Sequence, residues 1–220
     1  MNPIFVPTTG INSWKRLLAQ PSKHWKDDRS AKALATAWET AHGLPREIRA
    51  LLKPLGEVEL LLAMPEYKVD LPGGSRASQN DVFALLRTPT GLVSAMVEGK
   101  VDEPFGPTLE EWRKGMSAGK RTRLAHLCQK LALTETLADS IRYQLLHRAA
   151  SGVMMAERFH AADAAIIIHS FGTMSELSYA DYRAFLRLFG KSAESGQLIQ
   201  LGIPCGVRLW AGWANAPRRK

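Results

Sequence analysis

The spacing of hydrophobic residues changes several times along the chain and marks out helices and strands. In residues 30–42 the apolar side chains recur at helical spacing behind Ser30, a residue type favoured at helix N-termini. Residues 57–64 (EVELLLAM) are a short apolar run typical of a strand. The same criteria predict a short helix at 45–53, strands at 79–87 and 92–101, a helix opened by a capping box at Thr108 and Glu111, helices at 119–131 and 140–160, a strand at 164–169, a helix at 179–189 and a strand at 206–213.

The order of these elements predicts an α/β fold. A helix, three strands, helices, a strand, a helix and a final strand are typical of a mixed sheet with helices packed against it. A chain of 220 residues, 45% hydrophobic and 23% charged, can bury a core of its own. We therefore expect one domain over residues 1–220, with residues 1–29 as an N-terminal extension and residues 214–220 as a basic tail.

Charge and cysteine content indicate the partners and the cellular compartment of this domain. The formal net charge is +8 and the pI is near 9.7, which favours polyanionic partners such as nucleic acid, although a solvated basic face has the same composition. Two cysteines cannot build a disulfide framework. No apolar run is long enough to span a membrane, and the N-terminus lacks the pattern of a secretory signal. We expect a cytoplasmic protein that does not contact membranes.

The predicted hairpin brings two acidic residues together. A four-residue loop at 88–91 places Arg87 opposite Leu92, and the same register continued along the strands places Asp81 opposite Glu98. Like charges directly opposite each other in a sheet are destabilising. A divalent cation is the simplest compensation, because Mg²⁺ takes oxygen ligands and is often held by one or two carboxylates. The alternative is a salt-bridged, solvated sheet face.

Strand alternation adds a cation to the same patch. Glu98 and Lys100 are two residues apart and therefore project from the same face of the sheet. A lysine beside a phosphate and an attacking water can orient the water or stabilise the charge that develops on phosphorus. Two acids and one lysine at this spacing therefore favour metal-dependent phosphoryl chemistry.

This pattern, D-x(n)-E-x-K on a hairpin that follows a helix and a strand and precedes a helix and a strand, resembles the PD-(D/E)XK nuclease superfamily. The segments SQND, VEGKV, RYQLLHR and IIIHSF also resemble a group of uncharacterised bacterial proteins within it. The resemblance implies a restriction-endonuclease-like αβββαβ core. Asp81 falls on the first acid of the motif, and Glu98 and Lys100 on its E-x-K element. Asn80 stands where the motif has proline.

The resemblance also assigns roles outside the motif. Glu39, on the helix before the first strand, falls where many members carry a further acid. Gln144 falls where some members carry a glutamine or basic residue that lines the site. Asp81, Glu98 and the carbonyl of Gly99 are expected to hold Mg²⁺ or Mn²⁺. Gln144, Arg148 and Arg76 are expected to bind substrate, the two arginines by contacting phosphate.

We therefore expect a Mg²⁺-dependent phosphodiesterase that cleaves nucleic acid, with DNA favoured over RNA, and with Glu39, Asp81, Glu98 and Lys100 as catalytic residues. A catalytically idle relative that binds nucleic acid or protein is the alternative, since a fold does not guarantee an activity. An accessory component of a bacterial defence or repair system, active only with a partner protein, is a third possibility. A homodimer is compatible with all three.

Overall fold

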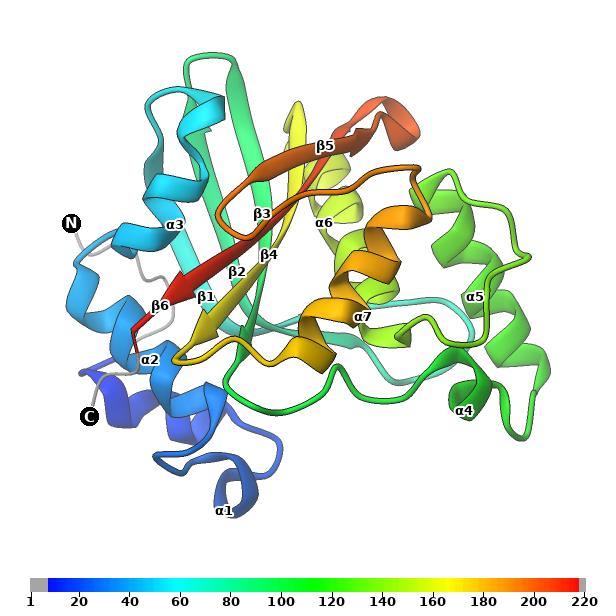
Figure 1. Ribbon diagram of the computed structural model, residues 1–220, viewed down its shortest axis with the longest axis horizontal. Coiled ribbons are helices and arrows are strands. Elements are labelled where there is room, and N and C mark those ends of the chain that lie inside the picture. Colours follow the sequence, from blue (N-terminus) through cyan, green and yellow to red (C-terminus); the bar gives the residue numbers. More distant parts are fainter. Residues whose placement is uncertain (1–7, 218–220) are drawn as a thin grey trace.

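The computed structural model describes residues 8–217 and contains one six-stranded mixed sheet flanked by helices on both faces (Figure 1). The strand order is β1-β2-β3-β4-β6-β5. The central strands β3, β4 and β6 run parallel, and the pairs β1–β2, β2–β3 and β5–β6 run antiparallel. The strands span β1 Glu59–Val69, β2 Ser78–Thr88, β3 Gly91–Lys100, β4 Asp163–Phe171, β5 Leu198–Gly202 and β6 Arg208–Ala216.

Helices cover the two faces of the sheet as two separate groups. In Figure 1, α5, α6 and α7 lie on one side of the sheet, and α2 and α3 lie on the other. The α-helices span α1 Pro21–His24, α2 Ser30–Ala41, α3 Arg46–Leu51, α4 Leu109–Arg113, α5 Ala118–Leu131, α6 Tyr143–Phe159 and α7 Glu176–Arg187, and the 3₁₀ helices span η1 Ile11–Leu17, η2 Lys53–Leu55 and η3 Pro204–Gly206. Among residues 8–217, no helix is long and apolar enough to cross a membrane.

The alternation of side chains along the strands gives each face its own hydrophobic core. Every residue of β4 is buried, as expected for a parallel strand with helices on both faces. Ile166 and Ile168 pack with α5, α6 and α7, whereas Ile167 packs with α2 and α3. The second group packs closely: a Cβ atom at Gly212 of β6 would lie 2.7 Å from Leu51 of α3. A larger residue at this position would require the Leu51 side chain to move.

The hairpin register expected from the sequence is confirmed. Arg87 pairs with Leu92, and Phe83 pairs with Met96. The loop itself is shorter than predicted, because Thr88 and Gly91 also pair and leave only Pro89 and Thr90 in the turn. The two extra paired residues extend the ladder without shifting it. The residues of the paired segments, 82–88 and 91–97, therefore keep their predicted faces.

The remaining elements follow the expected order with two additions. The predicted helices and strands are present within a few residues of their expected bounds, and Thr108 and Glu111 form the predicted capping box. The sequence reading missed β5 and gave no structure to residues 8–29. There η1 places Trp14 in the core beside α2, so this part of the predicted N-terminal extension belongs to the domain. The predicted basic tail began at residue 214, but residues 214–216 belong to β6; residues 218–220 of the tail and 1–7 of the extension lie outside the described residues.

Candidate functional site

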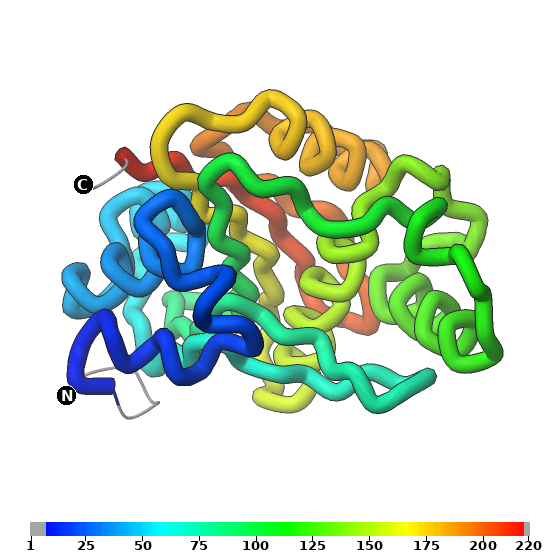
Figure 2. Tube along the Cα trace, turned by 90° about the horizontal axis from the view of Figure 1, so that it is seen from below, coloured from blue at the N-terminus to red at the C-terminus, as the bar shows by residue number. Residues whose placement is uncertain are grey.

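A cavity of about 580 Å³ opens where β3 ends at Lys100. In open α/β sheets, ligands bind outside the carboxyl ends of the parallel strands, and this cavity lies at such an end. Its lining residues come from the N-terminal segment, from β1 and β2, from the chain that follows β3 and from α6, and the course of these segments can be followed in Figure 2. The cavity is lined by Leu18, Ala19, Lys23, His24, Arg29, Ser30, Ala31, Glu66, Gln79, Asp81, Glu98, Lys100, Glu103, Pro104, Gly106, Gln144 and Arg148.

Glu98 lies at the centre of the polar contacts in this cavity and is only 3% exposed. Its Oε1 accepts hydrogen bonds from Lys100 Nζ at 2.8 Å and Gln144 Nε2 at 2.7 Å. Its Oε2 accepts one from Arg148 Nε, also at 2.7 Å. Burial alone would raise the pKa of Glu98, but the neighbouring Arg148 and Lys100 outweigh it and hold the pKa at about 2. Glu98 is therefore a buried, ionised carboxylate at neutral pH.

Asp81 is the second carboxylate and lies close to the same guanidinium. The ladder of β2 and β3 ends at the pair Val82–Val97, so Asp81 lies one residue beyond its last pair. Its Oδ1 is 3.5 Å from Arg148 Nη2, and its Oδ2 accepts the backbone N–H of Gly99 at 2.9 Å. Burial and then the charge of Glu98 raise the pKa of Asp81 well above its usual value. The cluster therefore favours a proton on Asp81 rather than on Glu98.

Glu66 is a third acid that the sequence analysis did not select. It lies in β1 between the pairs Pro65–Val82 and Tyr67–Asn80, which brings it opposite Asp81. Its backbone is left-handed, with φ +52°, a conformation that side-chain-bearing residues rarely adopt. Its carboxylate accepts a hydrogen bond from Gln79, and burial raises its pKa to about 7. The predicted strand ended at Met64, and no sequence pattern pointed to Glu66.

Helix α6 supplies the side chains that close this cluster from above the sheet. Gln144 and Arg148 are four residues apart and therefore project from the same side of the helix. Gln144 bridges Glu98 and Lys100, whose Nζ lies 3.4 Å from Gln144 Oε1 and 4.6 Å from the centroid of the Phe105 ring. Arg148 is 6% exposed, and its Nη1 is buried without a hydrogen-bond partner among the described residues. An unpaired buried donor is costly, so this atom is suited to receive an acceptor from a ligand.

Two residues expected at the site lie elsewhere. Glu39 does not line the cavity; its Oε1 accepts a hydrogen bond from Trp14 Nε1 at 2.7 Å. Helix α2 meets the cavity at Ser30, and nine residues of helix place Glu39 about 13 Å further along the axis. Arg76 lines a separate cavity. Glu39 therefore does not join Asp81, Glu98 and Lys100 as expected, whereas the expected role of Arg76 in substrate binding stays a prediction.

The divalent ion that the motif implies would need oxygen ligands in this cavity. Asp81 and Glu98 offer the oxygen ligands that Mg²⁺ takes. Within residues 8–217, however, no group of three or more His, Cys, Asp or Glu side chains is placed to hold a metal ion. Arg148 contacts both carboxylates instead. The donor chemistry of Asp81 and Glu98 therefore fits such an ion, provided that the guanidinium moves away from the pair.

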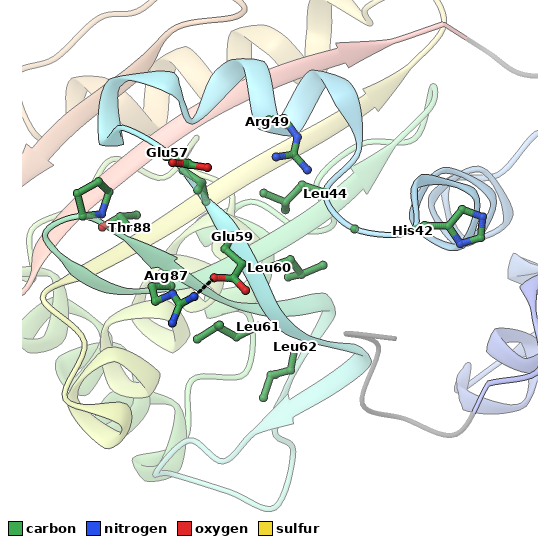
Figure 3. A pocket seen from close by; sticks show the side chains of 13 residues that line it. His42, Leu44, Arg49, Glu57, Glu59, Leu60, Leu61, Leu62, Arg87 and Thr88 are labelled. Atoms are coloured by element: carbon green, nitrogen blue, oxygen red, sulfur yellow. Dashed lines mark hydrogen bonds and ion pairs between the residues drawn. The ribbon is translucent and has the colours of Figure 1, made fainter. Parts of the chain in front are cut away.

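A larger cavity, of about 870 Å³, lies at the opposite end of the hairpin (Figure 3). It is lined by residues 42–44, 57–62 and 87–89 and by Arg49. Its one ion pair in Figure 3, between Arg87 and Glu59, joins side chains that are 63% and 54% exposed. Ion pairs as exposed as this one contribute little, and no buried acid or lysine lies there. The smaller cavity at Lys100 is therefore the better candidate.

Comparison with known proteins places the chain in a family without assigning a function. A family model described as a domain of unknown function (DUF6946) matches residues 7–218. The chain therefore belongs to this family. No curated protein matches the chain. No solved structure matches it either.

Proposed function

We propose that this protein is a nuclease of the PD-(D/E)XK type that hydrolyses phosphodiester bonds of nucleic acid, specifically DNA. The observation that carries the proposal is the buried contact of Glu98 with Lys100, Gln144 and Arg148 on the floor of a cavity. The succession α2, β1, β2, β3, α6, β4 also agrees with the αβββαβ core that the motif implies. Neither of these two observations depends on the net charge of the chain.

Two cations are placed to act on a phosphate. Lys100 is 3% exposed and Arg148 6%, yet both line the cavity. A charged group held in a dry site stabilises developing negative charge more strongly than it would in water. Lys100 orients the attacking water or neutralises the charge on phosphorus, and Arg148 Nη1 donates to a phosphate oxygen. In hydrolysis the water oxygen bonds to phosphorus, the bond to the leaving oxygen breaks, and that oxygen takes a proton.

Asp81 and Glu98, with the carbonyl of Gly99, would hold a Mg²⁺ or Mn²⁺ ion. Such an ion acts as a Lewis acid on a phosphoryl oxygen and makes water acidic enough to attack at neutral pH. Arg148 leaves the two carboxylates when it turns to the substrate phosphate. Asp81 and Glu98 would therefore exchange the Arg148 guanidinium for the metal ion when the substrate binds.

The rim of the cavity favours a polyanion as substrate. Lys23, His24 and Arg29 line it from the N-terminal segment, and the three side chains are exposed. Their positions allow contact with the phosphates on either side of the one that is attacked. Binding that depends on such contacts weakens steeply with salt.

A second function, that of a binding module without catalysis, is favoured by one observation. Both oxygens of Glu98 are already engaged, and Arg148 contacts both carboxylates. A site that keeps this arrangement would bind a phosphate through its cations and never bind a metal. Such a protein would share the fold and lack the activity.

Cleavage by the purified protein separates the two functions. Supercoiled plasmid is incubated with Mg²⁺, Mn²⁺ or a chelator, and nicking is followed on gels for the wild type and for Lys100→Met. We expect metal-dependent nicking that Lys100→Met reduces at least about a hundredfold, the lower range for loss of a transition-state contact. Lys53→Met, on an exposed lysine at the hairpin-turn end of the sheet, is the matched control and retains activity. Absence of nicking with every metal would leave only the binding module.

A further inference from the structure

A second, smaller cavity lies beside the candidate active site. Its volume is about 330 Å³, and it is lined by residues 73–76 and by Trp112, Lys120 and Arg123. The chain that enters β2 passes both cavities, with Arg76 of the β1–β2 loop in the small one and Gln79, the second residue of β2, in the large one. The chain after β3 does the same, with Gly106 in the large cavity and Trp112 in the small one. The two cavities are therefore neighbours on one surface.

The charged residues that line the small cavity are all positive. Three of its lining residues are cationic and none is acidic. Arg76 is exposed and makes no hydrogen bond or ion pair with the residues that the structure describes. Lys120 Nζ donates to the carbonyls of Trp112 and Lys114, each at 2.7 Å. This charge pattern differs from the mixed acids and bases of the large cavity and is suited to phosphate groups without a metal.

An aromatic ring forms one wall of the small cavity. Trp112 stacks on Tyr143 with ring centroids 4.4 Å apart and an interplanar angle of 14°. Lys120 Nζ lies over the Trp112 ring, 5.5 Å from its centroid, so a base that stacks on the indole has to displace this ammonium. Tyr143 precedes Gln144 of the candidate active site on helix α6. The indole is thus fixed from behind by a helix that also positions the catalytic cluster. A rigid, partly buried aromatic wall next to cations is the combination on which unpaired bases stack.

The opposite wall, residues 73–76, is held in place by close backbone contacts. Arg123 donates to the carbonyls of Leu71, Pro72 and Gly74 at 3.0–3.2 Å. A Cβ atom at Gly73 would lie 2.1 Å from the carbonyl oxygen of Gly119, and one at Gly119 would lie 2.5 Å from that of Gly73. Both positions therefore require glycine. The cavity is a built feature of the loop and helix α5 rather than a gap between mobile side chains.

We propose that this cavity binds an unpaired nucleotide of a single-stranded segment, its base against Trp112 and its phosphate on Arg76. The proposal rests on the proposed function, because the same strand would continue into the candidate active site. Arg76 and Gln79 are three positions apart, about 10 Å when the chain is extended, which is roughly three nucleotides at the spacing of one strand in a duplex. The substrate would then be single-stranded nucleic acid or a duplex with an unpaired end.

Binding without catalysis tests this site. A fluorescein-labelled oligothymidylate is titrated with the full-length protein in a chelator, and anisotropy gives the affinity of the wild type, Trp112→Ala, Trp112→Phe and Arg76→Ala. We expect Trp112→Ala to weaken binding about tenfold, within the range for loss of one base–aromatic stack, and Trp112→Phe to retain most of the affinity. Arg76→Ala should lower the salt dependence by about one phosphate contact.

Two comparisons make the result decisive. Lys53→Ala removes a remote exposed cation and should leave oligothymidylate affinity unchanged. A blunt duplex should bind wild type and Trp112→Ala equally. Wild-type affinity of Trp112→Ala for oligothymidylate, or an equal loss on both ligands, would overturn this site, even where nicking by the wild type still supports the nuclease. The converse result, a loss with Trp112→Ala and no nicking under any metal, would sustain this site and refute the nuclease.

Discussion

Glu98 and Asp163 are two buried carboxylates on neighbouring strands, yet they have different surroundings. Glu98 is 3% exposed and Asp163 is 1% exposed, and each is paired with an arginine. In the β3–β4 register Glu98 lies beside Ile168, five residues from Asp163 and about 17 Å along the strand. The two acids thus occupy opposite ends of the same part of the sheet.

The partners of Asp163 leave nothing unsatisfied. Its Oδ1 accepts from Arg208 Nε at 2.7 Å and from Trp210 Nε1 at 2.8 Å, and its Oδ2 accepts from Arg208 Nη2 at 2.6 Å. Asp163 lines neither of the cavities near Lys100. This acid joins β4 to β6 and has no further chemistry to offer. Its role is structural.

The surroundings of Glu98 contain more charge than one ion pair needs. Two cations share its oxygens, a second carboxylate lies against the same arginine, and Arg148 Nη1 has no partner among the described residues. Glu98, Asp81, Lys100 and Arg148 all line a cavity. The comparison teaches that burial and ion pairing do not by themselves indicate a functional site. Excess charge, an unsatisfied donor and access to a ligand together do.

The largest expected difference between the two acids is in catalysis. Glu98→Gln should reduce metal-dependent nicking of plasmid at least about a hundredfold, because it removes a negative ligand and weakens the placement of Lys100. Asp163→Asn should leave nicking within about twofold of the wild type once thermal unfolding has shown that both variants are folded at the assay temperature. Equal losses of nicking in Glu98→Gln and Asp163→Asn would show that the two acids do not differ in catalysis.

The free energy of unfolding, unlike catalysis, should depend on Asp163. Asp163→Asn weakens two hydrogen bonds from a guanidinium to a buried carboxylate, and we expect it to lower the free energy of unfolding by about 1–3 kcal/mol. Arg208 is 39% exposed, so water compensates part of the loss. Urea denaturation measures the change. A stability like that of the wild type would show that the pair is not structural.

Metal binding without catalysis sharpens the comparison further. Arg148→Met removes the guanidinium that contacts Asp81 and Glu98, and it should strengthen Mn²⁺ binding about tenfold, or about 1.4 kcal/mol, in isothermal titration calorimetry. Arg208→Met frees Asp163 in the same way but exposes a single carboxylate, so it should create no Mn²⁺ site. Unchanged or weaker Mn²⁺ binding in Arg148→Met would speak for the binding module.

The smallest effect concerns pH. Burial and then Arg148 lower the pKa of His147 well below 6.5, while its Nδ1 lies 2.8 Å from Ser78 Oγ. The unfolded chain therefore binds a proton more readily than the folded one below pH 6.5, and the stability due to neutral His147 is lost as the pH falls. His147→Gln should reduce the fall in unfolding free energy between pH 7 and 5.5 by about 1 kcal/mol. An identical pH dependence in both proteins would contradict this assignment.

Much of the fold and the centre of the site follow from local patterns. The two-residue alternation of a strand put Glu98 and Lys100 on one face, and the turn chemistry at residues 88–91 set the register that brings Asp81 beside them. These relations depend on neighbours within one hairpin, so the sequence by itself determined them. The helical spacing of α2, α5 and α6 is local in the same sense.

The remaining parts of the site were decided by tertiary structure. Arg148 reaches Glu98 across 50 residues of chain because α6 docks on the sheet at one particular rotation. Glu66 joins the acids through a left-handed residue inside β1, which no periodicity announces. Glu39 fits the motif in sequence but lies too far along α2 to take part. Side chains that meet through the packing of separate elements leave no repeat in the sequence, and only the assembled fold brings them together.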